Sequence, residues 1–119
     1  MNKILIEVSV GELLDKISIL EIKKGKIKDL EKLRYINEEL EVLKVQYKEN
    51  IKSDSKLEKL FESLKEINSK LWIIEDDKRI CEKNSDFTEK FIKLSRDVHF
   101  LNDDRAKIKL EINNHTGSK

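Results

Sequence analysis

The sequence predicts an all-α protein: an antiparallel up-and-down bundle of about four long helices, with a short N-terminal β-strand or extended arm. Three observations lead to this prediction. The chain contains no proline and 3 glycines, so the residues that punctuate β-rich folds are scarce. Charged residues make up 41% of its 119 residues, as in long solvated helices. Leucine and isoleucine recur between them at alternating spacings of three and four, the period of packed helices.

The length fits one domain, residues 1–119. The segments expected within it are a strand or arm at 3–10, helices at 10–25, 29–51, 55–83 and 86–113, and a frayed tail at 114–119. Because the connections are short, consecutive helices should lie antiparallel and pack as a coiled-coil-like bundle.

The first segment alternates from Lys3 to Val10, with Ile4, Ile6 and Val8 on one side, which is the period of a half-buried strand. No later segment looks like its partner. Two hypotheses remain open. The strand pairs with a second copy of the protein across a two-fold axis and forms a homodimer, or it packs as an extended arm on its own bundle.

The first helix begins at a predicted capping box, in which Ser9 Oγ accepts from the Glu12 amide and the Glu12 carboxylate reaches back to Ser9. Gly25 marks its expected end. Its apolar residues form a broad face that we expect to be the most buried of the chain: Leu13, Leu14, Ile17, Ile19, Leu20 and Ile22.

The later helices have similar start signals: Asp29, Asp54, and a second capping box of Asp86 with Glu89. Their stripes keep the three-four spacing. They are Leu33, Ile36, Leu40, Leu43 and Tyr47; then Leu57, Leu60, Leu64, Ile67, Leu71, Ile74, Lys78 and Cys81; then Phe87, Phe91, Leu94, Val98, Leu101, Arg105, Ile108 and Ile112. Charge interrupts the last two stripes, at Lys78 and Arg105.

If the last two helices fold back after Lys83, Glu75 lies across from Arg96, and Glu66 across from Arg105. Glu75 also lies one turn before Arg79, so Glu75, Arg79 and Arg96 are predicted to form an ion-pair cluster. Three interpretations stay open: the charges fix helix register, they form an anion site, or they are ordinary solvated charges.

Carboxylates on neighbouring helices suit a magnesium ion and nucleotide phosphates, as in all-α nucleotide pyrophosphohydrolases. The carboxylates that such a hydrolase would use here are Asp15, Glu75, Asp76 and Asp103, although their spacing along the sequence is generic. His99, His115 and Cys81 lack zinc-ligand spacing, and no glycine-rich phosphate loop is present. We therefore expect no catalytic residues, no metal and no cofactor.

The net charge of +1 gives no single-sign field, so we expect no nucleic-acid partner. No apolar run is long enough to cross a bilayer, and we expect no membrane partner. Cys81 is the single cysteine, which agrees with a reducing compartment and a cytoplasmic location.

Three motifs together resemble a family of short bacterial and marine-phage proteins catalogued as a domain of unknown function. The motifs are Ile6 to Ile17 (IEVSVGELLDKI) with Ile19 to Lys23 (ILEIK), then Leu71-Trp72 with Ile74 to Asp77 (IEDD), then Asn102-Asp103 with Arg105-Ala106. The resemblance spans Ile6 to about Asn113. It implies one compact helical domain and no known activity. It also implies that polar residues of these motifs belong to the family pattern: Glu12, Asp15, Lys16, Glu21, Lys23, Glu75, Asp76, Asp77, Asn102, Asp103 and Arg105.

The candidate site is a polar cluster: Asp15, Lys16, Glu75, Asp76, Asp77, Arg79, Arg96, Asp103 and Arg105. The first hypothesis for function is a non-enzymatic helical interaction or adaptor protein, a homodimer with a possible protein partner. The alternatives are the metal-dependent nucleotide hydrolase and an anion-binding module built on Arg79, Arg96 and Arg105.

Overall fold

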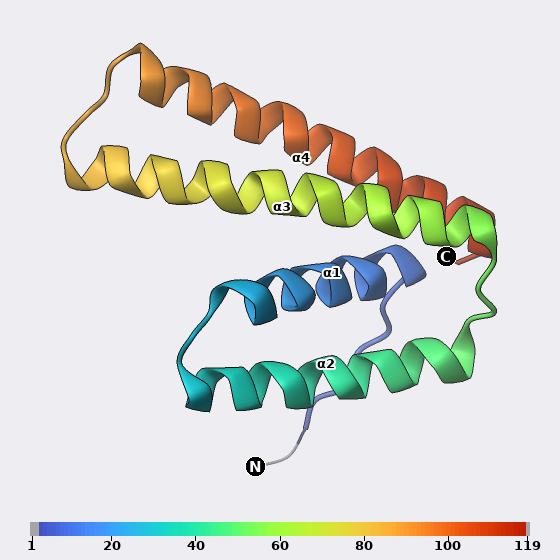
Figure 1. Cartoon of the computed structure of the whole chain (residues 1–119). Helices are drawn as coiled ribbons and strands as arrows, with labels where there is room; N and C mark the ends of the chain where they lie inside the picture. The colour runs from blue at the N-terminus through green and yellow to red at the C-terminus, as the bar shows by residue number, and fades with distance from the viewer. Residues whose placement is uncertain (1–2, 119) are drawn as a thin grey trace.

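Residues 3–118 are described by this computed structural model, and they form four α-helices (Figure 1). The helices are α1 (Val10–Lys26), α2 (Leu30–Asn50), α3 (Ser55–Lys83) and α4 (Glu89–Thr116). The prediction of an all-α chain with four helices is therefore confirmed. The bounds of α1, α2 and α3 differ from the predicted ranges by at most one residue.

Side-chain caps set where the first three helices begin. The Ser9 hydroxyl, the Asp29 carboxylate and the Asp54 carboxylate each accept a hydrogen bond from a backbone N–H two or three residues further on. These bonds satisfy N–H groups that have no partner inside the helix.

The last helix begins and ends later than predicted. The Asp86 carboxylate caps no helix, since it accepts from the Thr88 N–H at 3.2 Å and from Thr88 Oγ1 at 2.6 Å. This local turn delays the start of α4 to Glu89. At the other end, α4 continues into the predicted tail at 114–119. Gly117, with φ of 69°, then ends it in the left-handed conformation that glycine adopts readily.

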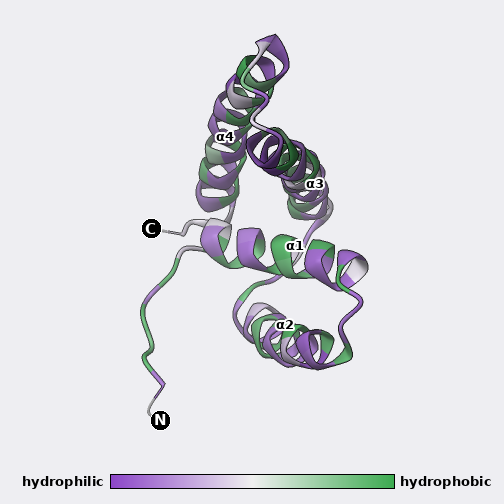
Figure 2. Cartoon of the chain, turned by 90° about the vertical axis from the view of Figure 1, so that its left-hand side faces the viewer, coloured by the Kyte–Doolittle hydropathy of each residue, from purple (hydrophilic) through white to green (hydrophobic). Residues whose placement is uncertain are grey.

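The central helix of the fold is α1. Its backbone comes within 8 Å of α2, α3 and α4, whereas α2 makes such approaches to α1 alone. The helices α3 and α4 lie side by side as an antiparallel hairpin (Figure 1). In Figure 2, α1 crosses beneath this hairpin and α2 lies on the opposite side of α1. Helix α1 thus lies between α2 on one side and the α3–α4 hairpin on the other. It contributes more buried residues than any other helix.

The apolar core surrounds α1. Its buried members are Leu14, Ile17, Leu20, Ile36, Leu40, Leu57, Leu64 and Ile112. Burial of each such side chain contributes about 1.5–3 kcal/mol. Helix α4 supplies Ile112 alone to this set, so its buried part lies close to its C-terminal end. None of the helices within residues 3–118 has the length and apolar character needed to cross a membrane.

The α3–α4 hairpin extends beyond α1. At 29 residues α3 is ~43 Å long, whereas the 17 residues of α1 span ~25 Å. The polar contacts of α1 with the hairpin reach Asn68 on α3 and begin at Arg105 on α4. The remainder, from Trp72 through the turn to Leu101, is called the distal hairpin below. Figure 1 shows it projecting past the end of α1.

The strand predicted for Lys3 to Val10 is not formed in the single chain. Residues 3–9, called the N-terminal arm below, have no regular secondary structure, and α1 begins at Val10. Ile4 and Ile6 are 89% and 77% exposed, so the arm does not pack on its own helices. Figure 2 shows it leaving the end of α1 and running away from the hairpin.

Gly11 lies at a close approach of α1 to α4. A Cβ here would lie 2.7 Å from the backbone oxygen of Lys109 and 3.0 Å from Asn113 Oδ1. Since a helix backbone cannot move aside cheaply, we predict that Gly11→Ala lowers the free energy of unfolding by about 1–3 kcal/mol in urea denaturation. Gly25→Ala is the control, because a Cβ there meets nothing within 4 Å. It should gain up to about 1 kcal/mol from helix propensity. Equal effects of the two substitutions would contradict the close approach.

Candidate functional site

The candidate polar residues meet where α1 crosses the α3–α4 hairpin. Asp15 faces this crossing from α1 and is 3% exposed. From α4, Arg105 Nε donates to Asp15 Oδ1 at 2.9 Å, and Arg105 Nη2 donates to Oδ2. From α3, Asn68 Nδ2 donates to Oδ1 at 2.9 Å. One carboxylate therefore binds side chains of two other helices, through the bidentate contact for which a guanidinium is shaped.

Ser18 completes the buried side of this contact. Asn68 Nδ2 also donates to Ser18 Oγ at 2.8 Å, and the Ser18 hydroxyl donates to the Asp15 backbone carbonyl at 2.8 Å. Ser18 is 0% exposed and Asn68 is 5% exposed. Within residues 3–118, every buried side-chain nitrogen or oxygen has a hydrogen-bond partner. The buried groups are thus satisfied by one another.

A second ion pair lies one turn nearer the start of α1. Lys109 Nζ on α4 donates to Glu12 Oε1 and lies 3.9 Å from Asp15 Oδ2. The predicted capping box is therefore half formed: Ser9 caps the helix, but the Glu12 carboxylate binds Lys109 instead of reaching back to Ser9. We call these connected ion pairs and hydrogen bonds the crossing network. Its members are Glu12, Asp15, Ser18, Asn68, Arg105 and Lys109.

The network keeps Asp15 charged. Burial would raise the pKa of the Asp15 carboxyl, but hydrogen bonds from Arg105 and Asn68 and the charges of Arg105 and Lys109 outweigh it. The pKa of Asp15 therefore lies below its ordinary value of 3.8. The same hydrogen bond from Arg105 to Asp15, together with the charge of Asp15, raises the pKa of Arg105 against the opposing effect of burial.

Two carboxylates face two cations in the crossing network, so it has no net charge with which to attract an ion. Its buried donors and acceptors are already used within the protein. This chemistry suits a positioning role, in which α1 is held in register against both helices of the hairpin.

The predicted cluster of Glu75, Arg79 and Arg96 is not formed, since within residues 3–118 no ion pair joins these three side chains. Arg79 Nη1 instead bonds Asp76 Oδ1 at 2.8 Å on an exposed face of its own helix. The Arg96 guanidinium lies 5.8 Å from the centre of the Phe100 ring. Glu66 was predicted to lie across from Arg105, but Arg105 turns towards α1 and Glu66 lies 3.5 Å from Lys70 on its own helix.

The other predicted site residues also lie outside the crossing network. Lys16 is exposed and lines a hollow of about 210 Å³ with Lys23 and Glu39. Asp103 lies 3.7 Å from His99 on the exposed side of α4. Asp77 is half-buried on α3.

The carboxylates of the hydrolase hypothesis do not converge. Asp15 binds Arg105, Asp76 binds Arg79, and Asp103 lies beside His99. Within residues 3–118, no group of three or more His, Cys, Asp and Glu side chains is placed to hold a metal ion.

Four members of the network were not among the predicted site residues: Glu12, which was predicted to form a capping box, and Ser18, Asn68 and Lys109. Asn68 carries a signal in hindsight, because it lies four residues after Leu64 and three before Leu71, both buried. A polar side chain at a buried position of a helix needs a polar partner. Ser18 and Lys109 stand in no such pattern.

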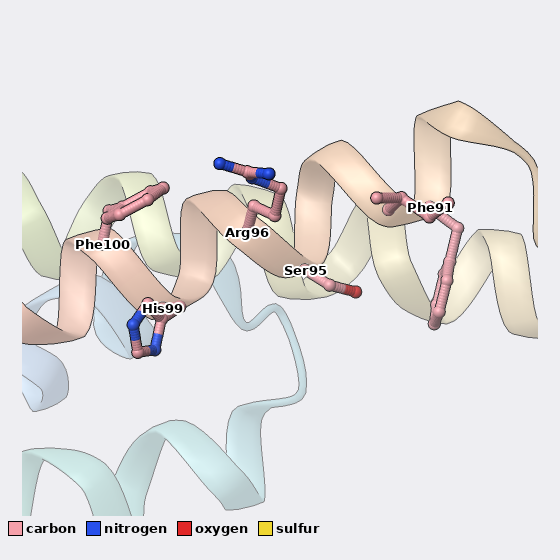
Figure 3. A pocket seen from close by; sticks show the side chains of 6 residues that line it. Phe91, Ser95, Arg96, His99 and Phe100 are labelled. Carbon is pink, nitrogen blue, oxygen red and sulfur yellow. The ribbon is translucent and has the colours of Figure 1, made fainter.

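A different candidate surface lies on the distal hairpin. One side of α4 forms a shallow apolar groove of about 540 Å³, lined by Phe91, Ile92, Ser95, Arg96, His99 and Phe100 (Figure 3). Ile92 and Phe100 are 55% and 53% exposed. The polar groups of this groove are Ser95, Arg96 and His99, and none of them belongs to the crossing network.

The crossing network predicts a large difference between its own carboxylate and an exposed one. Asp15→Asn keeps the shape but removes the charge that Arg105 binds, so we expect unfolding to become easier by about 2–4 kcal/mol in urea denaturation. Asp76→Asn, which removes the exposed partner of Arg79, should change the free energy by less than about 0.5 kcal/mol. A double-mutant cycle of Asp15→Asn with Arg105→Gln should reveal coupling, and additive effects would contradict the network.

The lowered pKa of Asp15 predicts a pH dependence. A carboxyl whose folded pKa lies below its unfolded pKa adds stability above the unfolded value, and this stability is lost as the pH falls through the folded value. The gap between wild type and Asp15→Asn should therefore narrow below pH 3.8 in urea titrations. Hydrogen bonds from the Leu57 N–H and the Thr88 hydroxyl also lower the pKa values of Asp54 and Asp86, so both proteins weaken in acid. A constant gap would contradict the prediction.

Comparison with known proteins assigns the chain by family alone. The model of a family of unknown function, DUF6165, matches residues 4–119. No curated protein and no solved structure gives a significant match. Because the match covers nearly the whole length, the chain belongs to this family of unknown function, DUF6165.

Proposed function

We propose that this chain is a non-enzymatic helical interaction protein that works as a homodimer, with the distal hairpin as its contact surface. The observation that carries the proposal is an apolar surface that no other part of residues 3–118 covers. Five large apolar side chains of the distal hairpin are each more than half exposed: Ile73, Ile80, Phe87, Ile92 and Phe100. Exposed apolar side chains gathered on one element are typical of interaction sites.

The helices explain why this surface exists. The stripe that α4 turns towards α3 continues through Phe91, Leu94 and Val98, but these side chains are only half-buried, since α1 does not extend to them. Two helices without a third layer cannot enclose their apolar side chains. A partner helix or strand laid on the distal hairpin would supply that layer.

Charge favours a second copy as the partner. The chain as a whole has a net charge of +1, and the distal hairpin carries lysines and arginines beside a nearly equal number of carboxylates. A surface with both signs can match itself when two copies meet across a two-fold axis. A strongly acidic or basic surface would repel its own copy.

The alternative chemistries have less support. A hydrolase needs converging carboxylates, and an anion site needs converging cations. Arg79 is paired with Asp76, Arg105 with Asp15, and Arg96 stacks near Phe100.

The proposal predicts that charge placed in the groove breaks self-association. Phe100→Glu and Ile92→Glu should shift a concentration-dependent dimer to monomer in sedimentation equilibrium, because each buries a carboxylate in the apolar contact. Both side chains are more than half exposed, so the fold should survive, as circular dichroism would show.

Leu110→Glu is the matched control, since Leu110 lies on the same helix outside the groove and is 59% exposed. It should leave the dimer unchanged. A wild-type chain that stays monomeric up to high micromolar concentration would overturn the homodimer.

A further inference from the structure

The N-terminal arm carries four exposed large apolar side chains, among them Ile4 and Leu5, the two most exposed in residues 3–118. Ile4, Leu5 and Ile6 are 89%, 90% and 77% exposed, and Val8 is 50% exposed. In a chain this rich in charge, four large apolar residues within five positions form the least soluble segment of its surface. An exposed apolar segment of this kind is typical of one that binds another protein surface.

The point where the arm leaves the fold is fixed. Val10 N donates to Ser118 Oγ at 3.0 Å, and Gly11 N donates to Asn113 Oδ1 at 2.8 Å. The Ser9 cap holds the first turn of α1. The arm therefore starts beside the C-terminal end of α4.

The arm cannot fill the groove of its own chain. Residues 3–9 span at most about 20 Å when extended. From Asn113 to Ser95, at the middle of the groove, the distance along α4 is about 27 Å. The arm also points away from the hairpin (Figure 2). The distance between arm and groove within one chain does not limit the arm of a second copy.

Arm and groove match in length and in chemistry. From Ile4 to Val8 an extended segment measures about 13 Å, and the groove from Phe91 to Phe100 measures about 14 Å. Both are apolar at their ends. The side of the extended arm that carries Ile4, Ile6 and Val8 is apolar, whereas Leu5 and Glu7 lie on its other side.

We infer that two copies exchange their N-terminal arms, with the arm of each copy lying in the α4 groove of the other. Ile4, Ile6 and Val8 alternate onto one side of the extended arm and cover the exposed faces of Ile92 and Phe100. The exchange is reciprocal, so every contact is made twice around the two-fold axis. This inference rests on the proposed homodimer and names the segment that completes it.

Truncation and charge insertion test the exchange in the full chain. Removal of residues 1–8, which keeps the Ser9 cap, and Ile6→Glu should each weaken dimerisation by about tenfold or more in sedimentation equilibrium. Glu7→Gln is the matched control, because Glu7 lies on the opposite side of the extended arm, and it should leave dimerisation unchanged. Unchanged dimerisation of the truncated chain or of Ile6→Glu would overturn the exchange.

Disulfide trapping tests which segments touch. A chain with Ile6→Cys, mixed with a differently tagged chain with Ser95→Cys, should form a disulfide between the two chains under mild oxidation. Val42→Cys on α2, where Val42 is 56% exposed, replaces Ser95→Cys in the control and should not cross-link. Cys81 is buried and stays in place in every variant.

The outcomes separate this inference from the proposed function. A dimer that survives truncation of the arm overturns the exchange but leaves the distal hairpin as a self-contact. A dimer that needs the arm but tolerates Ile92→Glu and Phe100→Glu means that the two arms pair with each other as strands, which also overturns the exchange. A monomeric wild type overturns both proposals.

Discussion

The buried carboxylate of Asp15 constrains the rest of the structure. An ionised group in the interior is stable only where opposite charge and hydrogen bonds replace water. Arg105 on α4 and Asn68 on α3 supply them together, so α1 has one position at which both bonds form. A shift of α1 by one turn would leave a charge without a partner. Apolar packing around Leu14 and Ile17 provides the larger stabilisation, but it tolerates more positions than the ion pair does.

This placement decides which surface stays open. Because α1 is held at the end of the hairpin where α4 finishes, its ~25 Å cannot cover helices that are ~43 Å long. Helix α2 does not compensate, since it approaches α1 alone. The distal hairpin is therefore a two-helix element whose apolar stripe is half covered. Its open surface follows from the position of the crossing network and from the lengths of the helices.

Local signals in the sequence were sufficient to predict where α1, α2 and α3 begin and end. They were not sufficient to predict which side chains of different helices bind one another. The caps at Ser9, Asp29 and Asp54 act within one turn, so a short window of sequence predicts them. Arg105 was recognisable as a charge in an apolar stripe, but its partner was not. Facing positions in α3 and α4 were inferred for an isolated pair, whereas the third helix, α1, captures Arg105. The alternation in the N-terminal arm likewise predicted a strand without a partner, and the single chain leaves that segment unpaired.

The contacts that stabilise the fold also position the two parts of the proposed interface. Glu12 and Asp15 tie the first turns of α1 to α4, and the Gly11 amide binds Asn113 a few residues further along. The arm therefore leaves at a constant distance and direction from the groove on the same α4 helix. In a two-fold assembly, the distance and direction from arm to groove within each chain determine whether both arms can reach both grooves at once. A loosened crossing would disturb the interface even with every arm and groove residue intact, because reciprocal binding requires both contacts to fit the same pair of rigid bodies.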